Sequence, residues 1–313
     1  MTQPVNMKAV ICTAYGAPEV LQLATIKKPV PKDNEVLVKI VATAVNSGDV
    51  RVRGLAVDGF LRIVMRFVLG FKRPRKPVLG TIYAGVVEAV GQQVRQFQPG
   101  DEVFGSRGFQ FGTYAEYITV AENSPIDHKP SNASFEEAAA ILFGGMTSAF
   151  FLHKAGIKSG QRVLVYGATG SVGTAAVEIA RSHGAIVTAV CGEQGVELAQ
   201  QLGSEAIIVY TSEAYKQLND QFDIIYDAVG KTTKKEFSAL LKPQGIYRTV
   251  GGLSVSKERK EQVSFLKRLF EEGKLHAHID KWYSINEIVE AHRYVDTGRK
   301  KGNVVVTIVA DNV

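Results

Sequence analysis

A glycine-rich turn between a short apolar segment and a helical pattern constrains this chain more than any other feature. Residues 162–166 (RVLVY) predict a buried strand, and Gly167, Gly170 and Gly173 follow it at regular spacing. Apolar residues then recur with helical periodicity from Val172 to Ala180. Glycines let the backbone turn tightly and approach an anion, and the free N–H groups at a helix start bind phosphate. The alternative is an ordinary tight turn, but the strand–turn–helix context favours a dinucleotide-binding turn.

The segments after residue 128 alternate between strand and helix patterns. Strands are predicted at residues 162–166, 186–190, 206–209, 222–227 and 245–250, with helices that include 196–202 and 232–241. This alternation predicts an α/β fold with a doubly wound parallel sheet. The apolar run 138–152 is shorter than the roughly 20 residues that span a membrane. We therefore interpret it as a buried helix pair or turn.

The first 127 residues are rich in strand patterns instead. Short strands are predicted at residues 35–41, 85–90, 101–104 and 115–120, separated by turn signals, which is typical of a small barrel. A helix near 285–297 and a strand at 304–309 are expected to return to this part of the molecule. We predict a catalytic domain of residues 1–127, completed by 271–313, and a cofactor-binding domain of residues 128–270.

Ligands of open α/β sheets bind at the carboxyl ends of the strands. The cofactor contacts predicted from such positions are Gly167, Gly170, Ser171, Val172, Gly173, Gly192, Glu193, Ala228, Val229, Val250, Gly251 and Gly252. Glu193 lies about 20 residues beyond the turn, where a carboxylate accepts hydrogen bonds from a ribose 2′-OH and repels a 2′-phosphate. These residues alone favour NAD, unless Glu193 simply points to solvent.

Charge and cysteine content narrow the function further. Lys and Arg number 37 against 31 Asp and Glu, and residues 59–77 hold six bases and no acid, so this segment carries the whole excess. Outside it the charges balance, which argues against a nucleic-acid partner. Two distant cysteines, Cys12 and Cys191, exclude a four-cysteine zinc lobe and a disulfide scaffold. Because the first residues also lack a secretory pattern, we expect a cytoplasmic protein without stable membrane insertion.

Two further patterns have less weight. His276 and His278 could supply two metal ligands from one strand, but the sequence offers no obvious third ligand. We therefore interpret them as surface or core histidines. A hydrolase is disfavoured because no Gly-x-Ser-x-Gly nucleophile motif occurs.

A family resemblance runs through seven segments spread over nearly the whole chain. These are residues 45–49, 79–91, 99–105, 112–117, 168–173, 227–230 and 301–304. On these motifs the chain resembles the medium-chain dehydrogenase/reductase superfamily, in its zinc-independent quinone oxidoreductase-like branch. The resemblance implies a GroES-like β-barrel catalytic domain plus a Rossmann domain, with the active site in the cleft between them. It also allows a homodimer.

The same resemblance bears on a catalytic metal. The zinc-ligand positions of zinc-dependent relatives correspond here to Asn46, Thr81 and Gly144, which ligate zinc poorly, and Ile82 replaces a neighbouring acid. Without a Lewis acid, an acceptor that delocalises its own charge is easier to reduce. The resemblance therefore implies hydride transfer from NAD(P)H to a small hydrophobic quinone or α,β-unsaturated carbonyl, with a proton from water or a cleft hydroxyl. The alternatives are an enoyl-thioester reductase, with Tyr83 as a weak proton-donor candidate, and a non-catalytic cofactor-binding or partner-binding relative.

Individual residues also take roles from the resemblance. Asn46 would lie near the nicotinamide ribose and Asp49 in the substrate cleft, Thr147 near the phosphate or nicotinamide end, Tyr210 on the adenosine side, and Asn303 would reach the cofactor from the C-terminal part. Capping of a turn or helix, or ordinary packing, is the plain alternative for each.

The cofactor and the basic segment complete the expectations. Most relatives of this branch use NADPH, with Ser and a basic residue where this chain has Gly192, Glu193 and Gln194. Tyr210 and the branch favour NADP(H) slightly over the NAD(H) that Glu193 indicates. The segment 59–77 is expected to cover the substrate cleft as a lid, with its apolar face inside and its basic residues outside. Binding to an anionic lipid surface is the minor alternative.

Overall fold

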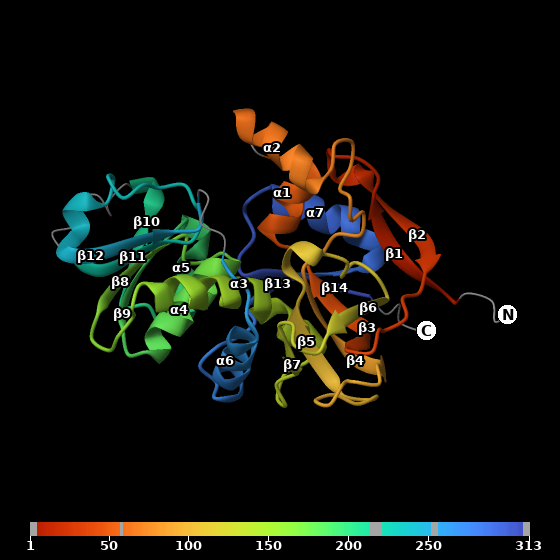
Figure 1. Ribbon diagram of the computed structural model, residues 1–313. Helices are drawn as coiled ribbons and strands as arrows, with labels where there is room; N and C mark the ends of the chain where they lie inside the picture. Colours follow the sequence, from red (N-terminus) through yellow and green to blue (C-terminus); the bar gives the residue numbers. More distant parts are fainter. Residues whose placement is uncertain (1–4, 57–58, 213–220, 252–255, 309–313) are drawn as a thin grey trace.

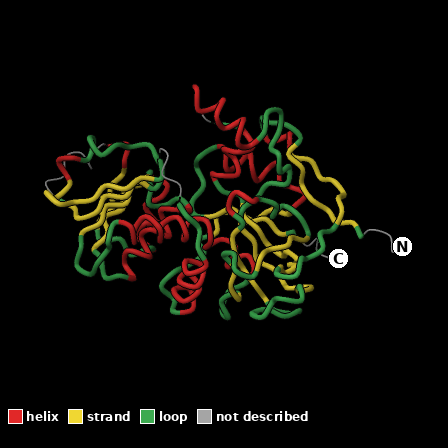
Figure 2. Tube along the Cα trace, viewed as in Figure 1, coloured by secondary structure: helices red, strands yellow, loops and turns green. Residues whose placement is uncertain are grey.

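The strand before the glycine turn lies at the centre of a five-stranded parallel sheet (Figures 1 and 2). The computed structural model describes residues 5–56, 59–212, 221–251 and 256–308. The strands of this sheet are β8 (Arg162–Tyr166), β9 (Ile186–Cys191), β10 (Ala206–Val209), β11 (Phe222–Asp227) and β12 (Leu241–Thr249). Their order is β10-β9-β8-β11-β12, and every pair is parallel. This is the Rossmann order 3-2-1-4-5, so the predicted doubly wound sheet is confirmed.

Two helices connect the first strands, and one predicted helix is wrong. The helix α4 (Ser171–Ser182) follows the glycine turn, and α5 (Val196–Gln201) precedes β10. Residues 232–241, predicted as a helix, form turns and a 3-10 segment, Ser238–Leu240, before β12. Hydrogen bonds to side chains hold the backbone there in a non-helical arrangement. Thr232 N–H donates to Asp227 Oδ2 at 2.9 Å, and Tyr247 Oη donates to the Thr232 carbonyl at 2.7 Å.

The long apolar run is one unbroken helix, α3 (Phe135–Lys154), rather than the predicted helix pair or turn. Ser134 and Glu137 form a capping box at its start. Gly144 and Gly145 do not break the helix; they allow neighbours to approach, since a Cβ on Gly144 would lie 2.1 Å from the Ser171 carbonyl oxygen. The helix is long and apolar enough to cross a membrane, but most of it is buried inside the fold, as in the core helix of a globular protein.

The second sheet contains strands from both ends of the sequence. Its order is β13-β14-β3-β4-β5-β7, and β6 pairs with β3. The strands are β3 (Glu35–Ala44), β4 (Ile82–Val90), β5 (Glu102–Ser106), β6 (Tyr117–Ala121), β7 (Ile126–His128), β13 (Ile279–Ser284) and β14 (Asn303–Thr307), beside a hairpin of β1 (Asn6–Cys12) and β2 (Leu21–Lys27). Because β14 pairs antiparallel with β3, the C-terminal segment returns to the sheet of the β-rich part, as expected. The residue boundaries of the two domains stay a prediction.

A continuous apolar core holds the two sheets in fixed relation. The helix α3 lies between them in Figure 1, and the core cluster around it includes Ala42 and Phe104 from one sheet and Val163 and Tyr226 from the other. The remaining helices lie around this frame: α1 (Ser47–Gly54), α2 (Gly59–Leu69), α6 (Lys260–Glu271) and α7 (Ile288–Asp296). Burial on both sides of α3 therefore sets the position of the cleft between the sheets.

Candidate active site in the cleft between the two sheets

Most of the predicted site residues line one large cleft of about 1870 Å³ between the two sheets. The predicted residues that border it are Asn46, Thr147, Gly167, Gly170, Ser171, Val172, Gly192, Glu193, Tyr210, Ala228, Val229 and Val250. They come from the carboxyl ends of the parallel strands, from the start of α4, from α3 and from the start of α1 on the facing wall. The structure thus brings together residues that are up to about 200 positions apart in the sequence.

The other predicted residues lie behind the cleft wall. Asp49 is fully buried beneath Asn46, and a Cβ on Gly251 would contact Gly230. Gly173 sits against the turn, where a Cβ would lie 2.0 Å from the Gly167 carbonyl oxygen. Asn303 is buried, with its Nδ2 donating to the Ala277 carbonyl at 2.6 Å, so its side chain supports the wall rather than bordering the cleft. Gly252 lies outside the described residues.

The glycine turn has the geometry of an anion site. Gly167 has φ of +78°, and a Cβ there would lie 2.1 Å from a Val229 methyl group. Gly170 instead faces open space, because the nearest atom to a Cβ built on it is 3.9 Å away. Gly170 is also the N-cap of α4 and has no side chain to satisfy the first N–H groups. Next to it, Ser171 Oγ is buried and makes no hydrogen bond to the described residues. Unpaired donors at a helix start fit the pyrophosphate of a nicotinamide dinucleotide.

Basic residues that the sequence analysis missed stand beside this turn. Gly302 N–H donates to the Thr169 carbonyl at 2.8 Å, which brings Arg299, Lys300 and Lys301 to the cleft wall. Lys300 Nζ donates to the Gly302 carbonyl at 2.6 Å, and burial lowers the pKa of this ammonium to about 8. The only sequence signal was the motif 301–304, which indicated the family and not a phosphate contact.

Glu193 borders the cleft beside an aromatic side chain, Tyr210. Glu193 begins a 3-10 turn, Glu193–Gly195, directly after β9, and it borders the cleft. Tyr210 packs over Gly192, because a Cβ on that glycine would lie 3.2 Å from the tyrosine ring. A carboxylate at the end of the second strand is where the ribose 2′-OH of a bound dinucleotide is read.

Asn46 is held rigidly at the opposite wall. As N-cap of α1, its Oδ1 accepts hydrogen bonds from Gly48 and Asp49 N–H, at 2.8 and 3.1 Å, while Asp49 Oδ2 accepts from Asn46 N–H. Asn46 Nδ2 donates to Thr81 Oγ1 at 2.9 Å. Both residues therefore cap α1, and their expected roles near the nicotinamide ribose and in the substrate cleft stay predictions. Burial raises the pKa of the Asp49 carboxyl to about 7.

The zinc positions do not fit a metal. Asn46 and Thr81 are bonded to each other, and Gly144 has no side chain and packs against the Ser171 backbone. Neither an amide nor a neutral threonine hydroxyl belongs to the thiolate, imidazole and carboxylate set that binds catalytic zinc. We therefore derive no step through a metal at this place.

Glu258 is an acidic group of the cleft that the sequence analysis missed. Its Oε2 lies 2.6 Å from Ser106 Oγ, which is also 3.1 Å from the Thr81 carbonyl. Burial raises the pKa of Glu258, so this carboxyl retains a proton to higher pH than an exposed one. Tyr83, the earlier candidate donor, is fully buried in the core of the β-rich part and does not border the cleft. Tyr83, a weak candidate within the enoyl-thioester reductase alternative, is therefore not placed to donate a proton in the cleft.

The expected lid is not seen over the cleft. The helix α2 projects away from the body of the molecule in Figure 1, and it is followed by the rest of the basic segment. Ile63, Phe67, Val68 and Phe71 are each more than half exposed, so the apolar face meets solvent. Within 59–77, only Lys76 is among the described residues that line the cleft.

The comparisons with known proteins agree with this geometry. Residues 32–130 match the alcohol dehydrogenase GroES-like domain family, and residues 171–281 match the family described as zinc-binding dehydrogenase. The chain is 36% identical to a 2-methylene-furan-3-one reductase of Solanum lycopersicum, over 97% of this chain and 79% of the relative.

It belongs to the medium-chain dehydrogenase/reductase superfamily, in the quinone oxidoreductase-like branch. Another member is the NADPH-dependent alkenal/one oxidoreductase, chloroplastic, of Arabidopsis thaliana, 30% identical over 97% of this chain and 80% of that protein. The solved quinone oxidoreductase from Coxiella burnetii superposes with a TM-score of 0.86, at 26% identity, over 97% of this chain and 100% of that chain. Like these members of the superfamily, the chain is an oxidoreductase, and its GroES-like plus Rossmann fold is confirmed.

Proposed function

We propose that this protein is an NAD(P)H-dependent, metal-independent reductase of quinones or α,β-unsaturated carbonyls. The observation that carries the proposal is the cleft itself. One wall presents the unpaired donors of the glycine turn, and the facing wall presents Asn46, Thr81 and Glu258, with no zinc-ligand set among the described residues between them. The names of the tomato, Arabidopsis and Coxiella relatives, which act on enones or quinones, support the same class.

Some residues of the cleft would bind the cofactor and the acceptor, and others would supply the proton. The first N–H groups of α4 and the Lys300 ammonium would hold the pyrophosphate, and Glu193 and Tyr210 would hold the adenosine end. A bound nicotinamide dinucleotide supplies the hydride for such a reduction. Phe109, Phe111 and Phe143 border the cleft and provide apolar surface for a flat acceptor.

In this proposal, Glu258 donates the proton. Hydride addition to an enone leaves negative charge on the substrate, which must then gain a proton. Burial raises the pKa of Glu258, so it keeps its proton to higher pH than an exposed carboxyl, and it borders the cleft next to Ser106 and Thr81. Asn46 Nδ2, fixed by Thr81, places an amide donor at the same wall.

The finer parts of the function are also proposed. NADP(H) is favoured slightly, because the Arabidopsis relative is named NADPH-dependent, while Glu193 at the end of the second strand supports NAD(H). We further propose a cytoplasmic protein that acts as a homodimer without membrane insertion or bound catalytic zinc. Size-exclusion chromatography with light scattering tests the dimer, and a monomer at micromolar concentration would refute it.

The activity is tested by following oxidation of NADPH and of NADH with ortho-quinones, para-quinones and enals. We expect turnover with at least one acceptor, and about 100-fold lower kcat with enals for Glu258→Gln. Glu261→Gln, on the exposed first turn of α6, is the matched control and should keep wild-type kcat. Cofactor binding without turnover of any acceptor would favour the non-catalytic alternative instead.

A further inference from the structure

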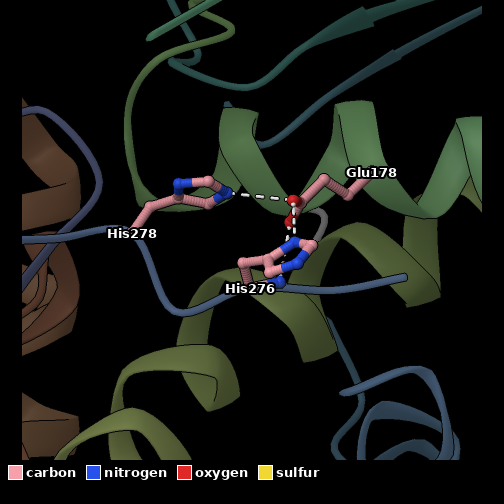
Figure 3. Close-up of side chains that lie close together, drawn as sticks. All are labelled: Glu178, His276 and His278. Carbon is pink, nitrogen blue, oxygen red and sulfur yellow. Dashed lines mark hydrogen bonds and ion pairs between the residues drawn. The ribbon is translucent and has the colours of Figure 1, made fainter. Parts of the chain in front are cut away.

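A buried carboxylate outside the cleft meets two imidazoles that come from a distant part of the sequence (Figure 3). Glu178 lies on α4, and its side chain is only 7% exposed. His276 Nδ1 and His278 Nε2 donate to the same oxygen, Glu178 Oε1, at 2.7 and 2.9 Å. His276 N–H donates to the other oxygen, Oε2, at 3.0 Å. The third ligand that the sequence could not supply thus stands 98 residues before His276.

These three groups form a ligand set that divalent transition metals prefer. Two imidazole nitrogens and one carboxylate oxygen are the donors of many zinc sites with one open position. The three ligand atoms all lie within 4.8 Å of one another. Tetrahedral zinc with bonds of about 2.1 Å needs about 3.4 Å between ligand atoms. The two hydrogen-bonded pairs, at 2.7 and 2.9 Å, would open by about 0.5 to 0.7 Å, a change within the reach of side-chain rotation.

The surroundings favour a cation and give it access. The cluster opens on a hollow of about 580 Å³ that Glu136 and Glu137 also line, and the described lining residues include neither Lys nor Arg. The His276 side chain is 60% exposed, so an ion can enter from solvent. The residues of this hollow are different from those that line the cofactor cleft.

We propose that Glu178, His276 and His278 bind one divalent transition-metal ion of the zinc class. On binding, the imidazole N–H groups that now face Glu178 give way to the ion, and each ring carries its proton on the other nitrogen. The ion would tie α4, which begins at the glycine turn, to the segment between α6 and β13. That segment connects the two sheets, and His278 is fixed in it with φ of +37° and a carbonyl that accepts from Asn303 N–H at 2.8 Å. The bound ion would therefore hold α4 and this segment together at the junction of the two domains. This role is independent of the proposed reductase activity.

Metal titration of the chelator-treated full chain tests the proposal. Calorimetry with Zn²⁺ should show one site, and Co²⁺ should give visible absorption bands of low-coordinate N/O ligation. His278→Ala and Glu178→Gln should each weaken Zn²⁺ binding by about 100-fold or more. His128→Ala is the control, because this exposed imidazole also lies near carboxylates, Asp101 and Asp127, and should leave the binding unchanged.

The variant Glu178→Gln distinguishes a metal site from a cluster that serves only as a set of hydrogen bonds. The substituted amide keeps an oxygen that accepts from the imidazoles but loses the charge that a metal needs. We expect the metal-free variant to unfold near the wild-type temperature, and Zn²⁺ to raise the midpoint of the wild type only. Equal Zn²⁺ affinity in the wild type and both site variants, or no affinity above that of weak surface sites, would overturn the proposal. If His278→Ala does not fold, the Co²⁺ spectrum of Glu178→Gln decides.

Discussion

Gly170→Ala separates the role of the glycine turn in cofactor binding from its role in the fold. Gly170 has φ of −82°, which alanine adopts without strain. A Cβ there meets no atom closer than 3.9 Å, so the folded chain has room for the methyl group. That open space is the place where a pyrophosphate would contact the first N–H groups of α4.

The expected loss follows from the contacts that the methyl group would block. A hydrogen bond from a backbone N–H to a charged phosphate contributes about 1.5–3 kcal/mol. Losing one such contact should raise the cofactor Kd by about 10- to 100-fold, since 1.4 kcal/mol corresponds to a factor of ten. The thermal midpoint should stay close to that of the wild type, because no packing changes.

Fluorescence titration with NADPH and NADH, together with thermal unfolding, provides the measurement. Gly173→Ala is the contrasting variant, since its Cβ would lie 2.0 Å from the Gly167 carbonyl oxygen and should destabilise the fold by about 1–3 kcal/mol or more. If Gly170→Ala binds both cofactors within about two-fold of the wild type, the turn is not the phosphate site and the reasoning fails.

Three further predictions concern charge. Glu193→Arg should raise the affinity for NADPH relative to NADH by about ten-fold or more, measured as a ratio of Kd values, and an unchanged ratio would mean that Glu193 does not read the ribose. Because burial lowers the pKa of Lys300 to about 8, the ammonium loses its proton as pH rises through 8, and the cofactor Kd should rise by up to about ten-fold per pH unit above that. The variant Lys300→Gln should bind the cofactor more weakly at neutral pH, and its cofactor Kd should not change between pH 7 and 10. A pH dependence equal to that of the wild type would exclude Lys300 as the titrating phosphate contact. Burial raises the pKa of Asp49 to about 7, so between its ordinary pKa near 4 and pH 7 the folded protein holds a proton that the unfolded chain has released. Wild-type stability should therefore fall as pH rises over that window, by at most about 4 kcal/mol, and Asp49→Asn should lack this share of the fall in denaturant titrations at several pH values.

The sequence predicted those features whose residue pattern lies within a short stretch of the chain, and it missed features that depend on tertiary contacts. The glycine turn and the alternating strands follow from short-range spacing, so the parallel sheet was predictable, and most of the residues predicted as cofactor contacts border the cleft. The single helix through Gly144 was not, because the approach of the Ser171 backbone that uses this glycine is a tertiary contact. The solvent-facing apolar side of α2 was also missed, since an amphipathic pattern does not say which neighbour covers it.

Residues from distant segments were the hardest part of the site to foresee. Lys300 reaches the glycine turn only because β14 pairs with β3, and Glu258 reaches Ser106 from the other half of the chain. The Glu178 contact with His276 is of the same kind. Spacing rules act along one element, and no such rule links residues that tertiary packing alone brings together.

The bridge between Gly170 and Gly302 has a consequence for synthesis on the ribosome. The strands of the parallel sheet are translated well before residues 299–303, and domains generally fold as units during translation. A nascent chain that stops short of these residues can form the glycine turn but lacks the basic wall of the proposed phosphate site. Cofactor capture would therefore be a late event in biogenesis, and only a chain that has been translated through β14 gains the stability that a bound dinucleotide adds.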